Sequence, residues 1–351
     1  MPSLGSERAT VQNPLIAYAT DIGWDCLPSD EALTLRRGES GTLLYPTLRE
    51  KLIALNPGII TAANVDEVIG RIESVRNNIE GNAEVLAWLR GERSVYVEAE
   101  KRQRNVALID FEHLAHNVFQ VTDEWEYTNG QHTNRADVVF LINGMPVALV
   151  ETKAARRTDA IDQGITQIRR YHREMPELMT APQVFDVTHL IDFYYGATWS
   201  LDRKNLFNWK DEEKGNFEKQ VKHFFDRGRF LQLLADWILF FKRDDELHKV
   251  ILRQHQTRAV EKVVERARDP EKRTGLIWHT QGSGKTFTMI TAAEHILRDP
   301  EKPTVLMLVD RNELESQLGR LRALRRGRPQ QAAPARAAPY RLSRPDRLHD
   351  P

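Results

Sequence analysis

The sequence predicts an α/β protein made of two consecutive units, and three observations lead to this prediction. Two apolar runs flank the turn residues Asn143 and Gly144, as in a buried hairpin. The segment TDAIDQGITQIRRYHRE follows them with helical periodicity. Further along, the glycine-rich segment HTQGSGKT lies between a strand-like run and a helix-like run. We therefore expect a sheet covered by helices, followed by a second sheet with a glycine-rich strand-to-helix loop.

Composition and motif order divide the chain into five segments. Residues 1–13 lack a continuous apolar run, which predicts a disordered tail and no signal peptide. Residues 319–351 are rich in Arg, Pro and Ala and lack apolar periodicity. Between these ends we expect a first unit at residues 14–200, a helical connector at residues 201–245 and an incomplete second unit at residues 246–318.

Hydrophobic periodicity predicts the elements ahead of the hairpin and in the connector. Phe119 and Val121 alternate with polar neighbours, which favours a strand. The apolar run Phe230–Phe241 is too short to span a bilayer and contains Asp236, so we interpret it as a packed helix. The elements expected in the first unit are helices Tyr45–Leu55 and Val65–Asn77 and strand-like segments Val106–Ile109 and Asn117–Trp125.

Two acids interrupt the two apolar strands of the hairpin, Ala136–Ile142 and Pro146–Thr152, and a lysine follows the second strand. Asp137 lies near the start of the first strand, and Glu151 lies near the end of the second, two residues before Lys153. Residues i and i+2 of a strand project from one face. Burying such groups costs several kcal/mol unless they pair with each other or with a metal ion. Carboxylates that hold Mg²⁺ beside a cation are what phosphodiester hydrolysis requires.

The register of the hairpin decides whether these side chains meet. A two-residue loop at Asn143-Gly144 would place Asp137 opposite Val150 and turn Glu151 to the other face. A three-residue loop, 143–145, would place Asp137 opposite Glu151. We predict the three-residue loop.

A second pair of residues follows on the predicted helix. Gln167 and Tyr171 are four residues apart and share one helical face, where they could orient the acids or contact a phosphate. Taken alone, the acid-and-lysine pattern equally fits a hairpin whose charged residues are solvated at the strand ends. The helix pair favours the catalytic interpretation.

Together, Asp137, the Glu151-x-Lys153 pair and the Gln167-x-x-x-Tyr171 pair resemble the PD-(D/E)xK nuclease core with the QxxxY extension of type I restriction enzymes. The resemblance implies a restriction-endonuclease-like PD-(D/E)xK domain in which Asp137 and Glu151 hold Mg²⁺. It also implies that Lys153 orients water or stabilises charge in the transition state.

One position departs from the family pattern. Ala136 replaces the proline that precedes the first acid, but this position supplies no chemistry. In the restriction (R) subunits of that family, the nuclease precedes a superfamily 2 translocase, which is consistent with the motif order of this chain.

The second unit contains a phosphate-loop sequence. We expect a strand at Gly275–His279, then the loop, then a helix at Phe287–Arg298. His279 replaces the usual first glycine of the motif. The backbone N–H groups of such a loop surround the β-phosphate of a nucleotide at the positive end of a helix. The candidate nucleotide-binding residues are Gly282, Ser283, Gly284, Lys285, which would reach the β/γ oxygens, and Thr286, whose hydroxyl would bind Mg²⁺.

Two segments around the loop resemble other superfamily 2 motifs. Upstream, Gln256 lies at the position that contacts the adenine of ATP in that family, although a glutamine on a helix is more often a surface residue. Downstream, we expect a buried-type strand at Thr304–Asp310. Arg311 and Gln317 lie in a segment similar to the one that lines the DNA track. The resemblance therefore implies a RecA-like P-loop domain, truncated after about residue 318.

The last segment is basic and unlike the rest. Residues 319–351 hold nine Arg against Asp346 and Asp350, so the preceding residues sum to −7 in a chain of net charge zero. One interpretation is a basic tail that binds phosphates. The other is an aberrant tail from out-of-frame translation of GC-rich DNA, which we favour because it interrupts a recognisable domain.

This interruption affects the expected chemistry. An ATP motor needs a later acidic residue and arginines from a second RecA-like lobe, and neither follows residue 318. We expect the chain to bind nucleotide without appreciable hydrolysis.

Other polar residues carry weaker functional signals. Glu50 is a candidate metal ligand, but a solvated position is the commoner case. The mixed charges from Glu98 to Arg104 suggest either a phosphate-contacting strip or a wet surface. His113 and His116 lack a further ligand at zinc spacing, so no role is assigned to them.

The resemblance implies a Mg²⁺- and ATP-dependent DNA endonuclease subunit that acts on double-stranded DNA with methyltransferase (M) and specificity (S) subunits. Cys26 is the chain's one cysteine, which excludes a disulfide framework, and we expect a cytoplasmic protein without membrane segments. Two alternatives remain: a catalytically silent remnant that binds DNA or the M subunit, and a stand-alone nuclease independent of ATP.

Overall fold

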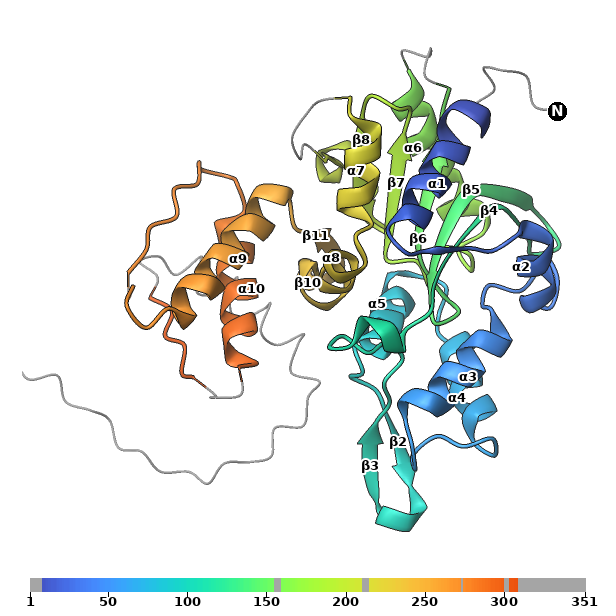
Figure 1. The fold of residues 1–351 in the computed structure, drawn as a ribbon, viewed down its shortest axis with the longest axis horizontal. Coiled ribbons are helices and arrows are strands. Elements are labelled where there is room, and N and C mark those ends of the chain that lie inside the picture. Colours follow the sequence, from blue (N-terminus) through green and yellow to red (C-terminus); the bar gives the residue numbers. More distant parts are fainter. Residues whose placement is uncertain (1–7, 155–158, 210–214, 273, 300–302, 309–351) are drawn as a thin grey trace, which may run out of the picture.

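The computed structural model describes residues 8–154, 159–209, 215–272, 274–299 and 303–308. Within them, the N-terminal unit is organised around a mixed seven-stranded sheet of order β1-β4-β5-β6-β7-β8-β9 (Figure 1). β1 and β4 are parallel, as are β6 and β7, and the other neighbours are antiparallel. The strands are β1 Asp25–Cys26, β4 Phe119–Thr128, β5 Thr133–Ile142, β6 Met145–Thr152, β7 Val184–Thr188, β8 Phe193–Ala197 and β9 Phe207–Asn208.

Helices cover both faces of this sheet. α6 (Ala160–Glu174) forms the crossover from β6 to parallel β7 and packs on both strands. Buried apolar side chains form one large cluster and one smaller cluster. In the large cluster, the Phe140 ring of β5 stacks on Phe225 with centroids 3.7 Å apart, and Trp24 meets Phe140 edge-on at 4.8 Å. The other helices of this unit are α1 Asn13–Asp21, α2 Ser29–Leu35, α3 Tyr45–Leu55, α4 Val65–Glu73, α5 Ile79–Leu89, α7 Phe217–Phe224 and α8 Arg227–Gln232.

The sequence prediction was correct for some elements and wrong for others. The helix expected at Tyr45–Leu55 is confirmed, and the one expected from Val65 ends at Glu73. No strand forms at Val106–Ile109. Instead β2 (Ser94–Val97) and β3 (Arg102–Asn105) form a separate hairpin just before it, which projects from the lower end of the molecule in Figure 1.

The β5–β6 turn corrects the predicted three-residue loop. Asn143 and Gly144 have φ of 53° and 81°, the two positive values of a tight two-residue turn. The register then shifts between Phe140 and Leu141, because β6 carries Val147 as an extra residue. Beyond this bulge Val138 pairs with Val150, so Asp137 and Glu151 are the next residues across the ladder. The predicted facing of the two acids therefore holds, but a bulge produces it rather than the loop length.

The predicted disordered tail is also corrected in part. Residues Arg8–Gln12 form a π-helical turn that leads into α1. Gln12 is 3% exposed and donates from Nε2 to the backbone oxygen of Asp137 at 2.8 Å. A buried polar contact with β5 fixes this segment, which an apolar pattern does not reveal.

The connector is a mixture of helix and strand. The expected helix Phe230–Phe241 is wrong in its second half: a π-helical turn at Leu233–Trp237 follows α8, and β10 (Ile238–Arg243) follows that turn. β10 pairs antiparallel with β11 (Glu246–Ile251), so the expected boundary at residue 245 falls inside a hairpin. A strand forms here instead of the expected helix because β-branched and aromatic residues pack well on a hairpin surface.

The second unit consists of α9 (Gln254–Arg268) and α10 (Lys285–Leu297), which pack together beside the β10–β11 hairpin (Figure 1). The strand expected at Gly275–His279 does not form, nor does one form in the described part of Thr304–Asp310. Strands need a hydrogen-bonded neighbour, and Leu276 and Trp278 are instead 85% and 87% exposed. No described helix is both long and apolar enough to cross a bilayer.

Candidate functional site

The two acids of the β5–β6 hairpin lie at the end of the ladder away from the turn. Asp137 Oδ2 accepts hydrogen bonds from the Thr152 backbone N–H at 2.8 Å and from the Thr152 hydroxyl at 3.1 Å. Glu151 precedes Thr152 and is fully buried, whereas the Asp137 side chain is 15% exposed. The pair therefore consists of one enclosed carboxylate and one that reaches the edge of the site.

Lys153 brings its charge to both acids. Its Nζ lies 3.3 Å from Glu151 Oε2 and 3.8 Å from Asp137 Oδ2. The backbone N–H of Lys153 donates to the Thr188 oxygen at 2.9 Å, which continues the β6–β7 pairing by one residue. The sheet itself thus aims the ammonium group at the carboxylates, as the i, i+2 spacing predicts.

Tyr171 and Gln167 of α6 complete the cluster. The Tyr171 hydroxyl lies 2.9 Å from Glu151 Oε1 and 2.7 Å from the Arg135 carbonyl oxygen, and it accepts from Gln167 Nε2 at 2.7 Å. The helix pair therefore contacts the buried acid through its tyrosine. The structure brings together all five residues that the sequence assigned to this site.

The environment of Glu151 disfavours its charged form. Burial, followed by the nearby Asp137 carboxylate, raises its pKa well above the ordinary value, against the opposing effects of Lys153 and Tyr171. Burial and the adjacent Glu151 also raise the pKa of the Tyr171 hydroxyl. A bound cation would stabilise the charged form of this buried acid.

These residues fit a divalent cation. Asp137 and Glu151 offer oxygen ligands, the type that Mg²⁺ prefers. The pKa of Glu151 is raised first by its burial and second by the nearby Asp137 carboxylate, and a bound cation would oppose both effects. Among the described residues of the site, Lys153 is the cation within 4 Å of both acids.

Sequence reasoning missed two supporting residues. Thr152 holds Asp137 through its backbone and its hydroxyl, and its position between the acid and the lysine was the available signal. Gln12 holds the Asp137 carbonyl and also donates to Glu124 Oε1 at 3.1 Å. No local pattern marks Gln12, because its partners lie more than a hundred residues away in sequence.

The glycine-rich loop before α10 contains two glycines with positive φ. Gly282 and Gly284 have φ of 75° and 81°, values that glycine adopts at little cost, and Gly284 immediately precedes α10. Lys285 is exposed, Thr286 is half-buried, and the hydroxyl of Ser283 is buried without a hydrogen-bond partner among the described residues. This arrangement fits phosphate binding at a helix N-terminus.

Gln256 already has partners in the structure. Its side-chain oxygen accepts from the Arg253 N–H at 2.7 Å, and its Nε2 donates to the Gly284 oxygen at 3.0 Å. The amide thus ties the start of α9 to the phosphate loop. Contact with adenine stays a prediction, and it would require the amide to exchange one of these hydrogen bonds.

The remaining sequence candidates are placed as follows. Glu50 is exposed on α3, as the solvated interpretation expects. Glu100 lies on the surface and pairs with Arg102 and Arg104. Arg311, Gln317 and the tail of residues 319–351 lie outside the described residues.

Comparison with known proteins identifies the first unit. The family model for the N terminus of type I restriction enzyme R proteins (HSDR_N) matches residues 5–202. The chain belongs to this family. The restriction-endonuclease-like reading of the first unit is thereby confirmed.

Individual relatives agree with the family. One, named MjaVIIP endonuclease subunit of a type I restriction enzyme from Methanocaldococcus jannaschii, is 32% identical over 63% of this chain and 22% of its own length. The HindI endonuclease subunit of Haemophilus influenzae is 28% identical over 85% of this chain and 31% of its own length. The SsaAORF53P endonuclease subunit of a type I restriction enzyme from Staphylococcus saprophyticus is 28% identical over 60% of this chain and 23% of its own length. The chain thus spans about a fifth to a third of these relatives.

A second family model matches the C-terminal part. The model of the SWI2/SNF2 ATPase matches residues 255–343. This range begins in α9, includes the phosphate loop and continues into the Arg/Pro/Ala-rich segment. A helicase-like unit after the nuclease-like unit is therefore confirmed.

Proposed function

We propose that this chain is the Mg²⁺-dependent DNA endonuclease part of an ATP-dependent type I restriction system. The observation that carries the proposal is the convergence of Asp137, Glu151 and Lys153 at one end of the β5–β6 hairpin, backed by Tyr171. The names of the relatives support the restriction role.

Asp137 and Glu151 would hold the metal ion. When bound, a divalent cation polarises the scissile phosphate and lowers the pKa of a coordinated water. Thr152 fixes the Asp137 carboxylate, and Tyr171 fixes that of Glu151. Lys153 donates to the phosphate oxygens as negative charge builds on them.

We further propose that the loop of residues 282–286 binds the phosphates of ATP, and that the chain works in the cytoplasm on double-stranded DNA with M and S subunits. The glycine conformations before α10 and the SWI2/SNF2 match support nucleotide binding. The relatives named as subunits support assembly into a larger complex.

A plasmid-nicking assay with Mg²⁺ tests the nuclease. We expect the chain to nick supercoiled DNA, with activity lost on chelation and reduced at least ~100-fold in Lys153→Ala, because one aimed charge stabilises the transition state by about 3 kcal/mol. Lys204→Ala, an exposed lysine outside the site, is the matched control. Equal activity of Lys153→Ala and the parent chain would refute the proposed site. No activity in the parent chain or in either variant would support the alternative that the chain is a catalytically silent remnant.

A further inference from the structure

A group of side chains of the kind that can bind a metal ion lies in the loop between β3 and β4. Asp110, His113 and His116 follow one another at spacings of three residues, and a single 3-10 turn at Leu114–His116 brings them together. The loop lies at the turn end of the β5–β6 hairpin. Asp137 and Ile142 are five steps apart along β5, a distance of ~16 Å, so this group is separate from the acids of the candidate nuclease site.

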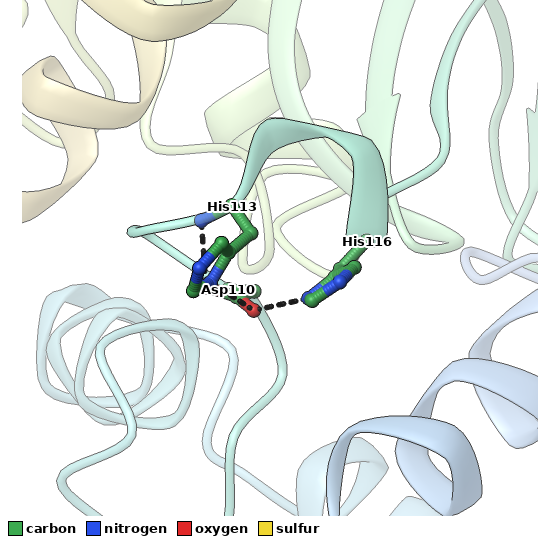
Figure 2. Close-up of side chains that lie close together, drawn as sticks. All are labelled: Asp110, His113 and His116. Carbon is green, nitrogen blue, oxygen red and sulfur yellow. Dashed lines mark hydrogen bonds and ion pairs between the residues drawn. The ribbon is translucent and has the colours of Figure 1, made fainter.

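The Asp110 carboxylate stands between the two imidazole rings (Figure 2). Its Oδ2 lies 2.7 Å from His116 Nδ1 and 3.4 Å from His113 Nδ1. Its Oδ1 accepts the backbone N–H groups of Glu112 and His113, each at 2.9 Å, so Oδ2 is left for the rings. All three donor atoms lie within 4.8 Å of one another. In a tetrahedral site with metal–ligand bonds of ~2.1 Å, the ligand atoms are about 3.4 Å from one another. A slight rotation of the two exposed imidazole rings would bring the three donor atoms to this spacing.

Buried amides hold the loop in this shape. Asn117 accepts the Asp110 N–H at 2.9 Å and donates to the Asp110 oxygen at 2.7 Å. Asn143, in the β5–β6 turn, donates to Asn117 Oδ1 at 2.8 Å and to the Leu108 oxygen at 2.7 Å. The backbone of Asp110 is therefore anchored to the central sheet before any ion binds.

From these observations we propose that Asp110, His113 and His116 bind a divalent transition-metal ion of the zinc type. Two imidazoles and one carboxylate suit Zn²⁺, whereas Mg²⁺ prefers oxygen ligands and binds poorly to imidazole. The side chains of His113 and His116 are 63% and 58% exposed, so the ion reaches them directly from solvent. The cluster offers three protein ligands, which leaves the fourth position to water or to a ligand from another molecule.

Such an ion would act as a clip on the loop. It would join residues 110 and 116 more firmly than the exposed Asp110–His116 contact, which alone contributes little to stability. It would also place a cation on the surface beside α3, where Lys51 donates to the His116 oxygen at 3.0 Å.

Titration of the untagged full chain with Co²⁺, in excess Mg²⁺ that occupies carboxylate sites, tests the proposal. We expect about one equivalent of Co²⁺ to give the strong visible absorption of four-coordinate cobalt, and Zn²⁺ to abolish it. His113→Gln should weaken binding at least ~10-fold, as loss of a ligand must exceed the effect of losing a supporting group. His132→Gln, an exposed histidine elsewhere, should bind as the parent does.

Asp110→Asn supplies a second, structurally conservative variant, because its oxygen can still accept the two backbone N–H groups. It should also weaken Co²⁺ binding while the circular dichroism spectrum stays unchanged. Absence of the absorption in the parent chain would overturn the proposal. So would titration curves of His113→Gln and Asp110→Asn that match the curve of the parent. Nicking activity does not enter this test, so its outcome is independent of the nuclease function.

Discussion

The hydroxyl of Tyr171 lies among three polar groups, and it is the contact between α6 and Glu151. Tyr171→Phe removes the contact and keeps the ring. We expect the nicking rate to fall ~10- to 100-fold, as when a group that orients a metal ligand is lost. The melting temperature should also fall, because unmet buried groups cost ~1–3 kcal/mol.

Tyr194→Phe is the control for this change, since Tyr194 is half-buried on β8 and its ring contacts Arg203 outside the site. An equal loss of activity in both variants would show that the effect is general destabilisation rather than orientation of Glu151.

Asp186 on β7 presents a buried carboxyl whose two oxygens have no hydrogen-bond partner among the described residues. Burial raises its pKa well above the ordinary value. The folded protein therefore keeps a proton that the unfolded chain releases above a pKa of ~3.9, and stability falls as pH rises from there towards the folded pKa.

Asp186→Asn cannot ionise, so its stability relative to the parent should increase by up to about 1.4 kcal/mol per pH unit across that interval. Melting temperatures at pH 5 and pH 8 measure this. Exposed Asp202→Asn should show no such trend, and a pH-independent difference for Asp186→Asn would contradict the expectation.

The β5–β6 turn packs against the start of α3 at Gly144, whose backbone oxygen accepts the Leu44 N–H at 2.9 Å. A Cβ at Gly144 would lie 2.6 Å from the Leu44 oxygen and 2.8 Å from the Leu48 nitrogen. Gly144→Ala therefore combines a strained positive φ with a backbone clash, and should destabilise the protein by ~2 kcal/mol or more.

Gly130→Ala separates the two causes. Gly130 has φ of 84°, close to the 81° of Gly144, but a Cβ there would meet nothing within 4 Å. Thermal unfolding of both variants should give a smaller loss for Gly130→Ala, and equal losses would show that the clash relaxes freely.

Local patterns predicted the elements whose reasons are local. The helix at Tyr45–Leu55, the hairpin strands and the face shared by Gln167 and Tyr171 all follow from periodicity. The bulge at Val147 did not, because it depends on how the sheet accommodates a fixed turn. The strand expected at Gly275–His279 failed for a similar reason, since pairing needs a neighbour that periodicity cannot supply.

Lys249 joins the β10–β11 hairpin to the first unit. Its buried Nζ lies 2.6–3.0 Å from four oxygens: Asn82 Oδ1, Thr198 Oγ1 and the backbone and side-chain oxygens of Gln183. Burial, then the charge of Arg90, lowers the pKa of this lysine well below its ordinary value. The hairpin leads directly into α9, so Lys249 anchors the connection between the two units.

Lys249→Met keeps the volume and removes the donors. The variant no longer bears the cost of burying the Lys249 amine, which favours its folded state. Several buried oxygens, however, lose their hydrogen-bond partner at a cost of ~1–3 kcal/mol each, so we expect a net destabilisation of about 3 kcal/mol. Limited proteolysis should cut the hairpin faster. Lys242→Met, exposed on β10 of the same hairpin, is the control, and equal cleavage rates would contradict an anchoring role.

The buried position of Gln12 has a practical consequence for protein production. The composition of residues 1–13 suggests that they could be removed from an expressed protein. Their removal would delete the Gln12 amide, which donates to the Asp137 carbonyl oxygen and to Glu124. The strand that carries Asp137 would lose this contact, so if the proposed function holds, we expect a trimmed preparation to nick DNA more slowly than the full chain.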